Sequence, residues 1–431
     1  MGCIRLSDSI VAIVILVFII VAFSTQKIPI AVTALLGGLA MMIFGIIEPV
    51  DVVSGFGSDT VMMVAGVIVI GNALFETGLA THVGAMILRY KAAAKNEKIF
   101  LLIVLCIVTL LSAVMSNTAT VAIFMPLIAS VAAASKGIIT KKNTYMAVGI
   151  ASVLGGNLTL AGSTPQMIAQ SILATTDGVR EMTFFEMLKG SLPLVIVMLL
   201  YYATFGYSLQ KRVFTFPEES EYTGDQLELS VEKKFSKKII SLLILIFAIV
   251  GFCSGIFSMG TIALLGACLC VLTGCISIRR VYETMDWSTL IVLGGAMGFS
   301  TGLSESGAVA LIAGKIVDIF GQMEGAGFIT FALLIVLAAI LTNFMSNTAT
   351  VSIILPIGLS VATMMDLDPI TVTIGIVIGC NLSFSTPIAT PPLTMTLVAG
   401  YRFTDYVKAG GPLNILLLIV AVVTLPLIYG L

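Results

Sequence analysis

The sequence predicts an all-helical protein that crosses a membrane many times and consists of two inverted repeats. Of its 431 residues, 58% are hydrophobic and 10% are charged, and the mean hydropathy is +1.12. A water-soluble fold cannot bury that much apolar surface. The segment Ser116-Asn117-Thr118-Ala119-Thr120-Val121 returns unchanged as Ser346-Asn347-Thr348-Ala349-Thr350-Val351. The charges that flank the two copies are opposite in sign, which predicts opposite orientations in the membrane.

The first half contains several predicted spans and one hairpin. A helix rises ~1.5 Å per residue, so roughly 20 apolar residues cross the ~30 Å hydrocarbon layer. The apolar stretch 10–23 could pass for a signal sequence, but no small-residue cleavage site follows, so it is kept as a helix. In chain order the segments are 9–24, 29–47, 60–79, an element at 80–93 that ends at the membrane surface, the hairpin arms 99–115 and 119–135, then 144–161, 166–175 and 185–208.

The second half repeats this pattern after a polar interruption. Residues 210–238 mix acidic and basic side chains, which predicts a solvated linker. The following segments are 239–257, 260–277, 288–303, an amphipathic 306–320, the hairpin arms 328–345 and 349–364, then 370–386, 391–399 and 409–430. We therefore expect eleven transmembrane helices and two re-entrant hairpins. The expected units are an extra N-terminal helix at 1–27, a first repeat at 28–208, a cytoplasmic linker at 209–238 and a second repeat at 239–431.

The duplication extends beyond the hexapeptide. Glu76-Thr77-Gly78-Leu79 aligns with Glu305-Ser306-Gly307-Ala308 at nearly the same spacing. Basic residues flank the first hairpin, and acidic residues with a single lysine flank the second. These are Arg89, Lys91, Lys95, Lys98, Lys136, Lys141 and Lys142 for the first, and Asp318, Glu324, Asp366, Asp368 and Lys315 for the second. The positive-inside rule then predicts a multi-pass protein of the cell (inner) membrane with a cytoplasmic N-terminus and an outside C-terminus.

The repeated Ser-Asn-Thr segments predict a binding site. At the tip of a re-entrant hairpin the backbone N–H and C=O groups lack helical partners, and leaving them bare in hydrocarbon costs several kcal/mol. Helix N-termini suit an anion, and carbonyl and side-chain oxygens suit a small cation. Asn117 and Asn347 offer both an amide donor and an oxygen acceptor. Ser112 and Thr342 each stand one helical turn earlier on the same face, which favours a cation site.

Each hairpin is followed by a second polar island. These islands are Gly156 to Pro165 and Asn381 to Pro392. Gly162 and Ala389 have small side chains that expose backbone carbonyls, and the prolines break the surrounding helix. The simplest alternative is that Ser, Asn and Thr merely cap helices. Duplication with opposed charges favours a shared site at the repeat interface instead.

Charge distribution predicts cation coupling. No charged residue occurs in 99–135, 143–176, 325–365 or 369–401. A dianion bound by these segments would therefore need amides, hydroxyls, helix ends and co-bound cations to balance its charge. Glu76 and Glu305 have either a structural role at helix ends or a role in coupling. The single histidine, His82, is expected at the interface, and the seven cysteines are expected to be small buried side chains.

The paired signatures, with Gly162-Ser163-Thr164-Pro165 and Ala389-Thr390-Pro391-Pro392 after them, resemble the divalent anion:sodium symporter family. This resemblance covers residues 28–431. It implies eleven transmembrane helices with two hairpins in the ion-transporter superfamily, a homodimer, and an elevator motion of a transport domain against a scaffold. It also implies two sodium sites, one at Ser112, Ser116, Asn117 and Gly162 and the other at Thr342, Met345 (through its backbone), Asn347 and Ala389. The implied substrate ligands are Asn117, Thr118, Ser163, Asn347, Thr348, Thr390 and Pro391.

The expected function is sodium-coupled import of a small divalent anion, with C4-dicarboxylates such as succinate, malate and fumarate as the main candidates. Thr164 and Leu393 depart from the family pattern at positions that bear on the substrate. Sulfate or another inorganic oxyanion, and sodium-independent exchange, are therefore the alternatives. No nucleophile and base pair, metal-ligand cluster or phosphate loop occurs in the sequence, so neither an enzyme nor an organic cofactor is expected. The expected partners are the anion, sodium ions and the lipid bilayer, without nucleic acid.

Overall fold

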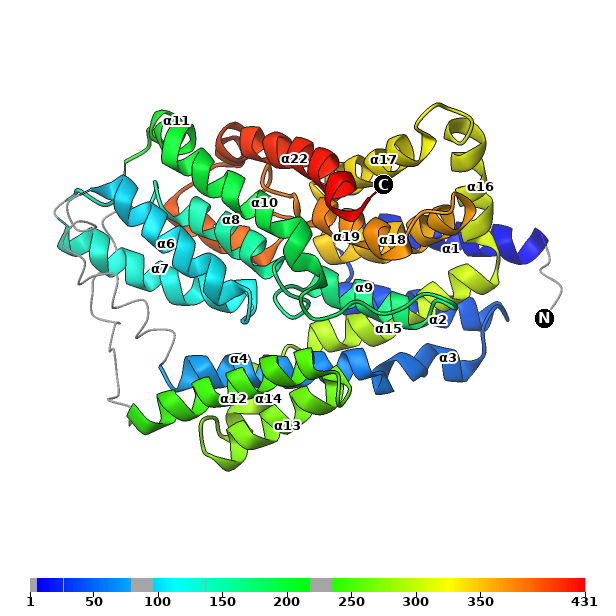
Figure 1. Ribbon diagram of the computed structural model, residues 1–431, viewed down its shortest axis with the longest axis horizontal. Coiled ribbons are helices and arrows are strands. Elements are labelled where there is room, and N and C mark those ends of the chain that lie inside the picture. Colours follow the sequence, from blue (N-terminus) through cyan, green and yellow to red (C-terminus); the bar gives the residue numbers. More distant parts are fainter. Residues whose placement is uncertain (1–5, 26, 79–95, 136, 218–234, 431) are drawn as a thin grey trace.

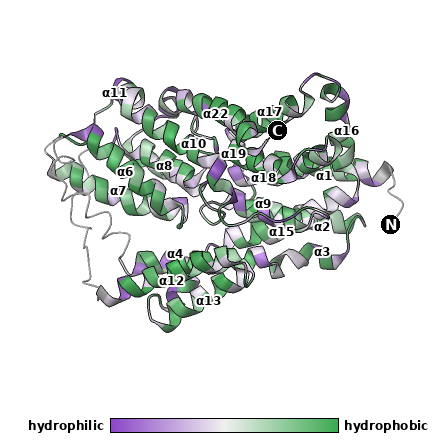
Figure 2. Cartoon of the chain, in the orientation of Figure 1, coloured by the Kyte–Doolittle hydropathy of each residue, from purple (hydrophilic) through white to green (hydrophobic). Residues whose placement is uncertain are grey.

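The computed structural model describes residues 6–25, 27–78, 96–135, 137–217 and 235–430, and its regular elements there are all helical. Most helices run along the long axis of the molecule (Figure 1), and their residues are mainly hydrophobic (Figure 2). Five helical segments are long and apolar enough to cross a membrane, which agrees with the expected multi-spanning class. They are Pro49–Glu76, Glu186–Val213, Ser236–Ser254, Asn347–Met364 and Phe403–Tyr429.

The first half begins with α1 (Leu6–Thr25) and ends with α11 (Tyr207–Val213). Between them lie α2 (Ile30–Ile43), α3 (Pro49–Ser54), α4 (Asp59–Glu76), α6 (Glu97–Ser112), α7 (Asn117–Ala134), α8 (Tyr145–Gly156), α9 (Thr164–Ala174) and α10 (Glu186–Tyr201). Local sequence sets several boundaries. Ser58 caps α4 by accepting a hydrogen bond from the Val61 amide, and Pro49 occupies the first turn of α3, where its missing N–H costs nothing.

The second half runs from α12 (Phe235–Ser254) to α22 (Gly411–Tyr429). Its other helices are α13 (Met259–Leu272), α14 (Ile278–Thr284), α15 (Trp287–Glu305), α16 (Ala308–Phe320), α17 (Ala326–Thr342), α18 (Asn347–Met364), α19 (Pro369–Asn381), α20 (Pro391–Met395) and α21 (Phe403–Asp405). The linker expected at 209–238 is shortened by helix at both ends, because α11 continues to Val213 and α12 already includes Phe235. Residues 218–234 lie outside the described part.

The two halves have matching elements. Helices α7 and α18 each have 18 residues and an internal proline, Pro126 and Pro356. Gly78 and Gly307 both have φ of 73°, a left-handed conformation that favours glycine. The halves also exchange contacts reciprocally: α2 packs on α15, and α4 packs on α13. These contacts are close because small residues face each other. A Cβ added to Gly66 of α4 would lie 2.4 Å from the carbonyl carbon of Ala263 on α13.

Helix α1 has a counterpart as well. Helix α1 packs on α2 as α12 packs on α13, the counterpart of α2 in the second repeat. The sequence predicted residues 1–27 as an extra helix outside the repeats. We propose instead that α1 is the first helix of the first repeat.

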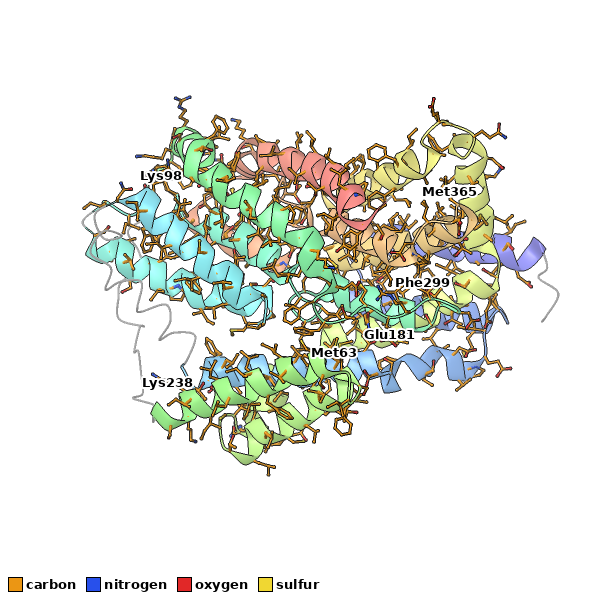
Figure 3. The ribbon with its side chains drawn as sticks, in the orientation of Figure 1. Met63, Lys98, Glu181, Lys238, Phe299 and Met365 are labelled. Atoms are coloured by element: carbon orange, nitrogen blue, oxygen red, sulfur yellow. The ribbon has the colours of Figure 1, made fainter. Side chains whose placement is uncertain are left out.

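The two hairpins enter the molecule from opposite ends. Helices α6 and α7 meet at residues 113–116, and α17 and α18 meet at residues 343–346. Lys98, at the open end of the first hairpin, and Lys238 lie at one end of the molecule, whereas Met365, at the open end of the second, lies at the other (Figure 3). This geometry fits the opposed charges that flank the two hairpins in the sequence.

The structure tests only part of the expected topology. Helix α16, the expected amphipathic segment, lies across the direction of its neighbours at the end where α1 begins (Figure 1). The predicted placement of the two termini on opposite sides of the membrane stays a prediction. The total of eleven spans depends on residues 80–93, which lie outside the described residues together with His82, Arg89, Lys91, Lys95 and Lys136. Among the described cysteines, Cys106, Cys253 and Cys268 are exposed, and only Cys270, Cys275 and Cys380 are buried.

Candidate functional site

The hairpin tips are built alike. Ser116 accepts a hydrogen bond from the Ala119 amide at 3.2 Å, and Ser346 accepts one from the Ala349 amide at 3.1 Å. The two serines therefore cap α7 and α18, as the simple alternative predicted. The residues that follow them, Asn117 and Asn347, have 8% and 5% of their surface exposed. Their side chains point into the protein rather than toward water at a helix end, so capping does not account for them.

The second polar islands separate α8 from α9 and α19 from α20. Ser163 and Thr390, the residues just before α9 and α20, share an extended backbone with φ of −151° and −145°. Neither side chain caps its helix. Prolines occupy the first turn of both helices and leave fewer N–H groups to satisfy there. Both hydroxyls consequently remain available to a ligand.

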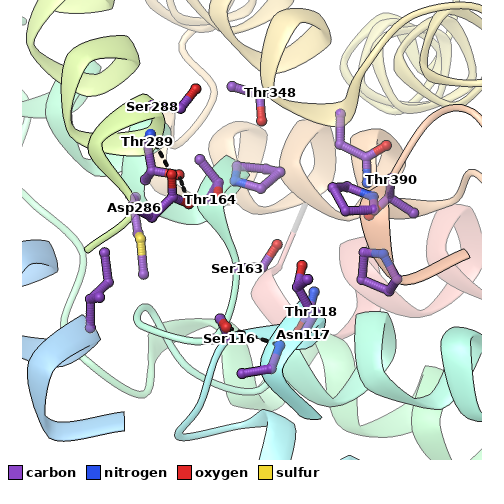
Figure 4. Close-up of a pocket in the computed structure, with 18 of the residues that line it drawn as sticks. Ser116, Asn117, Thr118, Ser163, Thr164, Asp286, Ser288, Thr289, Thr348 and Thr390 are labelled. Carbon is purple, nitrogen blue, oxygen red and sulfur yellow. Dashed lines mark hydrogen bonds between the residues drawn. The ribbon is translucent and has the colours of Figure 1, made fainter. Parts of the chain in front are cut away.

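All four islands line one cavity of about 600 Å³. The tip residues Ser116, Asn117 and Thr118 share this space with Ser163, Thr348 and Thr390 (Figure 4). The opposite wall comes from the helices α2, α4, α14 and α15. It contributes Ile30, Val67, Ile68, Gly71, Asn72, Thr284, Asp286, Ser288, Thr289 and Val292.

The structure brings together most of the residues named from the sequence. All seven expected substrate ligands line the cavity: Asn117, Thr118, Ser163, Asn347, Thr348, Thr390 and Pro391. Of the expected sodium ligands, Ser116, Gly162 and Ala389 also line it. The remaining three, Ser112, Thr342 and Met345, are buried behind the tips. The two hydroxyls among them contact the tip asparagines directly.

At the first tip, oxygen atoms cluster around Asn117. Ser112 Oγ lies 2.8 Å from the Asn117 side-chain oxygen. The same end of the amide lies 3.0 Å from the Gly162 carbonyl oxygen and 2.8 Å from the Ser152 carbonyl oxygen, so it makes hydrogen bonds to both only when the NH2 group points there. With the Asn117 oxygen turned toward these groups, it would join the Ser112 hydroxyl oxygen and the carbonyl oxygens of Gly162 and Ser152 in the donor set that a small cation prefers. The hydrogen bonds thus favour the amide orientation opposite to the one that a cation would favour.

The second tip has a related arrangement. Thr342 Oγ1 donates to Asn347 Oδ1 at 2.8 Å and lies 2.6 Å from the Cys380 carbonyl oxygen. The Asn347 backbone amide lies 3.4 Å from the Ala389 carbonyl oxygen. Here the amide already directs its oxygen toward a hydroxyl. Thr342 thus corresponds to Ser112 in position and in partner.

Charge is nearly absent from the cavity. Among the described residues that line it there is no lysine, arginine or histidine, and Asp286 is the one charged side chain. Glu76 and Glu305 do not line it, and Glu76 instead forms an ion pair with Arg280 at 2.8 Å. Within the described ranges no cluster of three His, Cys, Asp or Glu side chains occurs that would hold a multivalent metal ion. The site is therefore a hydrogen-bonding pocket whose described lining has no basic side chain and one carboxylate, that of Asp286.

Sequence reasoning missed two groups of residues. The first is the far wall with Asp286, whose signal was the polar run Asp286 to Thr289 at the start of a predicted span. The second is a set of buried amides behind the cavity, Asn157, Gln166 and Asn381, each with 0% exposure. Asn157 and Asn381 stand at equivalent places after the two hairpins. That repetition was visible in the sequence.

The chain matches the family model described as citrate transporter over residues 20–371. It belongs to the citrate transporter family. Its relatives include the sodium-dependent dicarboxylate transporter SdcS of Staphylococcus saprophyticus, which is 24% identical over 80% of this chain and 72% of SdcS. The resemblance to the divalent anion:sodium symporters is thereby confirmed.

Two further relatives are transporters without an assigned substrate. An uncharacterized transporter of Haemophilus influenzae is 29% identical to this citrate transporter family member over 82% of this chain and 77% of that protein. The uncharacterized transporter YfbS of Escherichia coli is 29% identical over 44% of this chain, and the match spans only 30% of YfbS.

Solved structures of membrane transporters share the fold. The YdaH transporter of Alcanivorax borkumensis aligns with a TM-score of 0.61 at 14% identity, over 91% of this chain and 88% of that one. Neisseria gonorrhoeae MtrF aligns with a TM-score of 0.60 at 14% identity, over 97% of this chain and 94% of its own. At this identity the alignments establish the fold class and leave the substrate open.

Proposed function

We propose that this member of the citrate transporter family is a sodium-coupled symporter that imports a small divalent anion, with C4-dicarboxylates as substrates. The observation that carries the proposal is the cavity, lined by amides and hydroxyls, where two oppositely inserted Ser-Asn-Thr tips meet. A dianion there gains hydrogen bonds from amides, hydroxyls and helix N-termini. Since no basic side chain lines the cavity, positive charge has to come from ions bound with the substrate.

The donor sets at the two tips support sodium as that ion. Asn117 with Ser112 and Gly162, and Asn347 with Thr342 and Ala389, offer uncharged oxygens in a buried setting. Hard oxygen ligands without carboxylates suit a monovalent cation better than a transition metal. The sodium dependence in the name of the relative SdcS supports the same choice.

The proposed motion is an elevator movement within a homodimer. One wall of the cavity comes from the hairpins and broken helices, and the other comes from α2, α4, α14 and α15. A ligand held mainly by the first group travels with that group when it slides past the second. Both alternatives, an inorganic oxyanion as substrate and sodium-independent exchange, use the same wall of amides and are decided by experiment.

The deciding experiment measures uptake of labelled succinate into proteoliposomes that contain the purified protein. We expect uptake with an inward sodium gradient, none with choline in place of sodium, and competition by other C4-dicarboxylates. Competition by sulfate alone would replace the substrate assignment, and equal uptake in choline would exclude sodium coupling.

Two substitutions test the site itself. Asn117→Ala and Asn347→Ala each remove one donor and one acceptor from the cavity, and we expect at least a hundredfold loss of uptake, since buried polar partners left unpaired cost ~1–3 kcal/mol each. Asn96→Ala is the matched control, because Asn96 caps α6 far from the cavity through the amides of Lys98 and Ile99. Wild-type uptake by either tip variant would refute the assignment of the tips.

A further inference from the structure

Buried amide side chains form a chain behind the cavity that joins the two repeats. Asn347 Nδ2 donates to Asn381 Oδ1 at 3.1 Å, and Asn381 Nδ2 donates to Gln166 Oε1 at 3.5 Å. Gln166 Nε2 in turn donates to Asn157 Oδ1 at 3.1 Å. Gln166, Asn381 and Asn157 are all fully buried. The link between Gln166 and Asn381 spans 215 residues of sequence and connects one repeat to the other.

Each end of this amide chain reaches one group of expected sodium ligands. At the second tip, Asn347 is itself such a ligand. At the first, Gln166 Nε2 also donates to the Gly156 carbonyl oxygen at 3.0 Å. The Gly156 backbone lies directly against the Asn117 cluster, because a Cβ on Gly156 would lie 2.2 Å from Asn117 Oδ1 and 2.9 Å from the Gly162 carbonyl oxygen. A shift of Gly156 therefore moves the ligands of the first site.

One residue makes the connection asymmetric. Gln166 directly follows Pro165, and the residue that follows Pro392 at the equivalent place is Leu393. Leu393 is also fully buried. The equivalent turn of the second repeat therefore folds with an apolar side chain at that position, so the turn itself does not require the amide at 166.

The amide chain has a defined polarity. Each amide accepts at its oxygen and donates at its nitrogen, so the orientation of one fixes the orientation of the next. At the first-site end the order is incomplete. Asn157 Nδ2 is buried without a hydrogen-bond partner among the described residues, and the Asn117 amide satisfies its hydrogen bonds only with its NH2 group toward Ser112, Ser152 and Gly162. A cation bound among these oxygens would reverse the Asn117 amide, and the chain would transmit the change toward Asn347.

We propose that Gln166 is a positioning residue that couples the two sodium sites, so that occupancy of either site raises the sodium affinity of the other. The inference rests on the proposed sodium coupling. By linkage the effect is reciprocal, and couplings between sites commonly change an affinity about 5- to 150-fold. Two sites coupled in this way give a sigmoidal sodium dependence with a Hill coefficient that approaches 2.

The test compares Gln166→Leu with the wild type in two sodium titrations of the full-length protein. The first follows succinate uptake in proteoliposomes, and the second follows the sodium-induced rise in melting temperature without substrate. For Gln166→Leu we expect the Hill coefficient to fall to about 1 and the half-saturating sodium concentration to rise about fivefold, with an unchanged maximal rate. Gln170→Leu is the matched control. Gln170 is a fully buried amide on the same helix, but its partners are Glu181 and Met182.

Further variants separate coupling from a general loss of stability. Asn381→Leu breaks the same chain, so the double variant should lower the Hill coefficient no further than either single variant. Should Gln166→Leu fail to fold, Gln166→Glu keeps the shape and loses the donor to Gly156, and it should show the same fall. A wild-type Hill coefficient in either folded variant, or an equal fall in Gln170→Leu, overturns the inference. A wild type without sodium dependence would instead refute the proposed function, and with it this inference.

Discussion

Gly162 and Ala389 occupy equivalent positions of the two repeats, but the space available for a side chain differs between them. A Cβ added to Gly162 would lie 2.4 Å from the Gly156 carbonyl oxygen and 2.6 Å from its Cα. Backbone atoms on both sides cannot move aside as a flexible side chain would. Ala389 carries its Cβ at the corresponding place and still lines the cavity. The two halves of the site are therefore alike in chemistry but not in packing.

This difference predicts unequal effects of exchanging the two residues. Overpacking of this kind costs ~1–3 kcal/mol, so we expect Gly162→Ala to lower sodium-dependent uptake about tenfold or more, since ~1.4 kcal/mol corresponds to a factor of ten. Ala389→Gly creates no clash and should keep most of its activity. Uptake by proteoliposomes with matched protein content measures both, and an active Gly162→Ala variant would show that the first site is looser than the structure indicates.

Asp286 is the charged residue of the cavity, and its role is electrostatic as well as structural. It accepts hydrogen bonds from the Thr289 backbone amide at 3.0 Å and from its hydroxyl at 2.5 Å, and so caps α15. Asparagine caps a helix as well as aspartate does. Asp286→Asn thus removes the charge while the helix start is preserved.

We expect Asp286→Asn to lower the KM for a dianion by about two- to fivefold, because unit charges roughly 8 Å apart in water interact by about 0.5 kcal/mol and the dianion carries two. The effect should shrink as ionic strength rises. Uptake kinetics at two concentrations of choline chloride, with sodium held constant, measure both. A raised KM would mean that the carboxylate holds a cation rather than repels the anion.

At the scale of elements, Glu97 fixes the base of the first hairpin. It is the first residue of α6 and has 7% of its surface exposed. Its carboxylate accepts hydrogen bonds from the Thr140 amide (2.8 Å) and hydroxyl (2.5 Å), the Asn143 amide (3.0 Å) and the Tyr207 hydroxyl (2.6 Å). It thus joins the hairpin to the loop before α8 and to α11.

Glu97→Ala leaves these donors without their acceptor, and we expect a loss of about 3 kcal/mol or more in stability, as for other broken buried charge networks. A lower melting temperature of the purified protein would show it. Glu324→Ala, an exposed glutamate near the base of the second hairpin, is the control and should melt like the wild type. Equal melting temperatures for the two variants would contradict the proposed role of Glu97 at the hairpin base.

At the scale of the whole molecule, local repetition and hydropathy predicted the hairpins and the residues that line the cavity, because both signals come from contiguous stretches of sequence. Neither signal predicts which distant segments pack together. The amide chain from Asn347 to Asn157 depends on which buried faces meet, and Asp286 reaches the cavity only because α15 packs on α2. The direction of α16 likewise follows from its neighbours, since its amphipathic pattern suits a surface helix and a span alike.

The residues of the wall formed by α2, α4 and α14 indicate toward which end of the molecule the cavity opens. Ile30 lies at the start of α2, Asn72 near the end of α4 and Thr284 at the end of α14. Arg280, at this end, pairs with Glu76, and Lys98 and Lys238 lie at the same end (Figure 3). By the positive-inside rule we expect this end to be cytoplasmic. We therefore propose that the structure corresponds to an inward-facing state.

Site-directed labelling tests this orientation. In a chain whose native cysteines are replaced, we expect Glu324→Cys to react with a membrane-impermeant maleimide on intact cells, and Lys98→Cys only after permeabilisation. Glu324 is preferable to Asp366, because Asp366 has φ of 54° and a cysteine there would be strained. Ser288→Cys, on the far wall of the cavity, should label from the Lys98 side and be protected by succinate with sodium. Labelling of Lys98→Cys and Glu324→Cys from the same side would mean that the two hairpins do not enter from opposite faces, and the shared cavity would lose its basis.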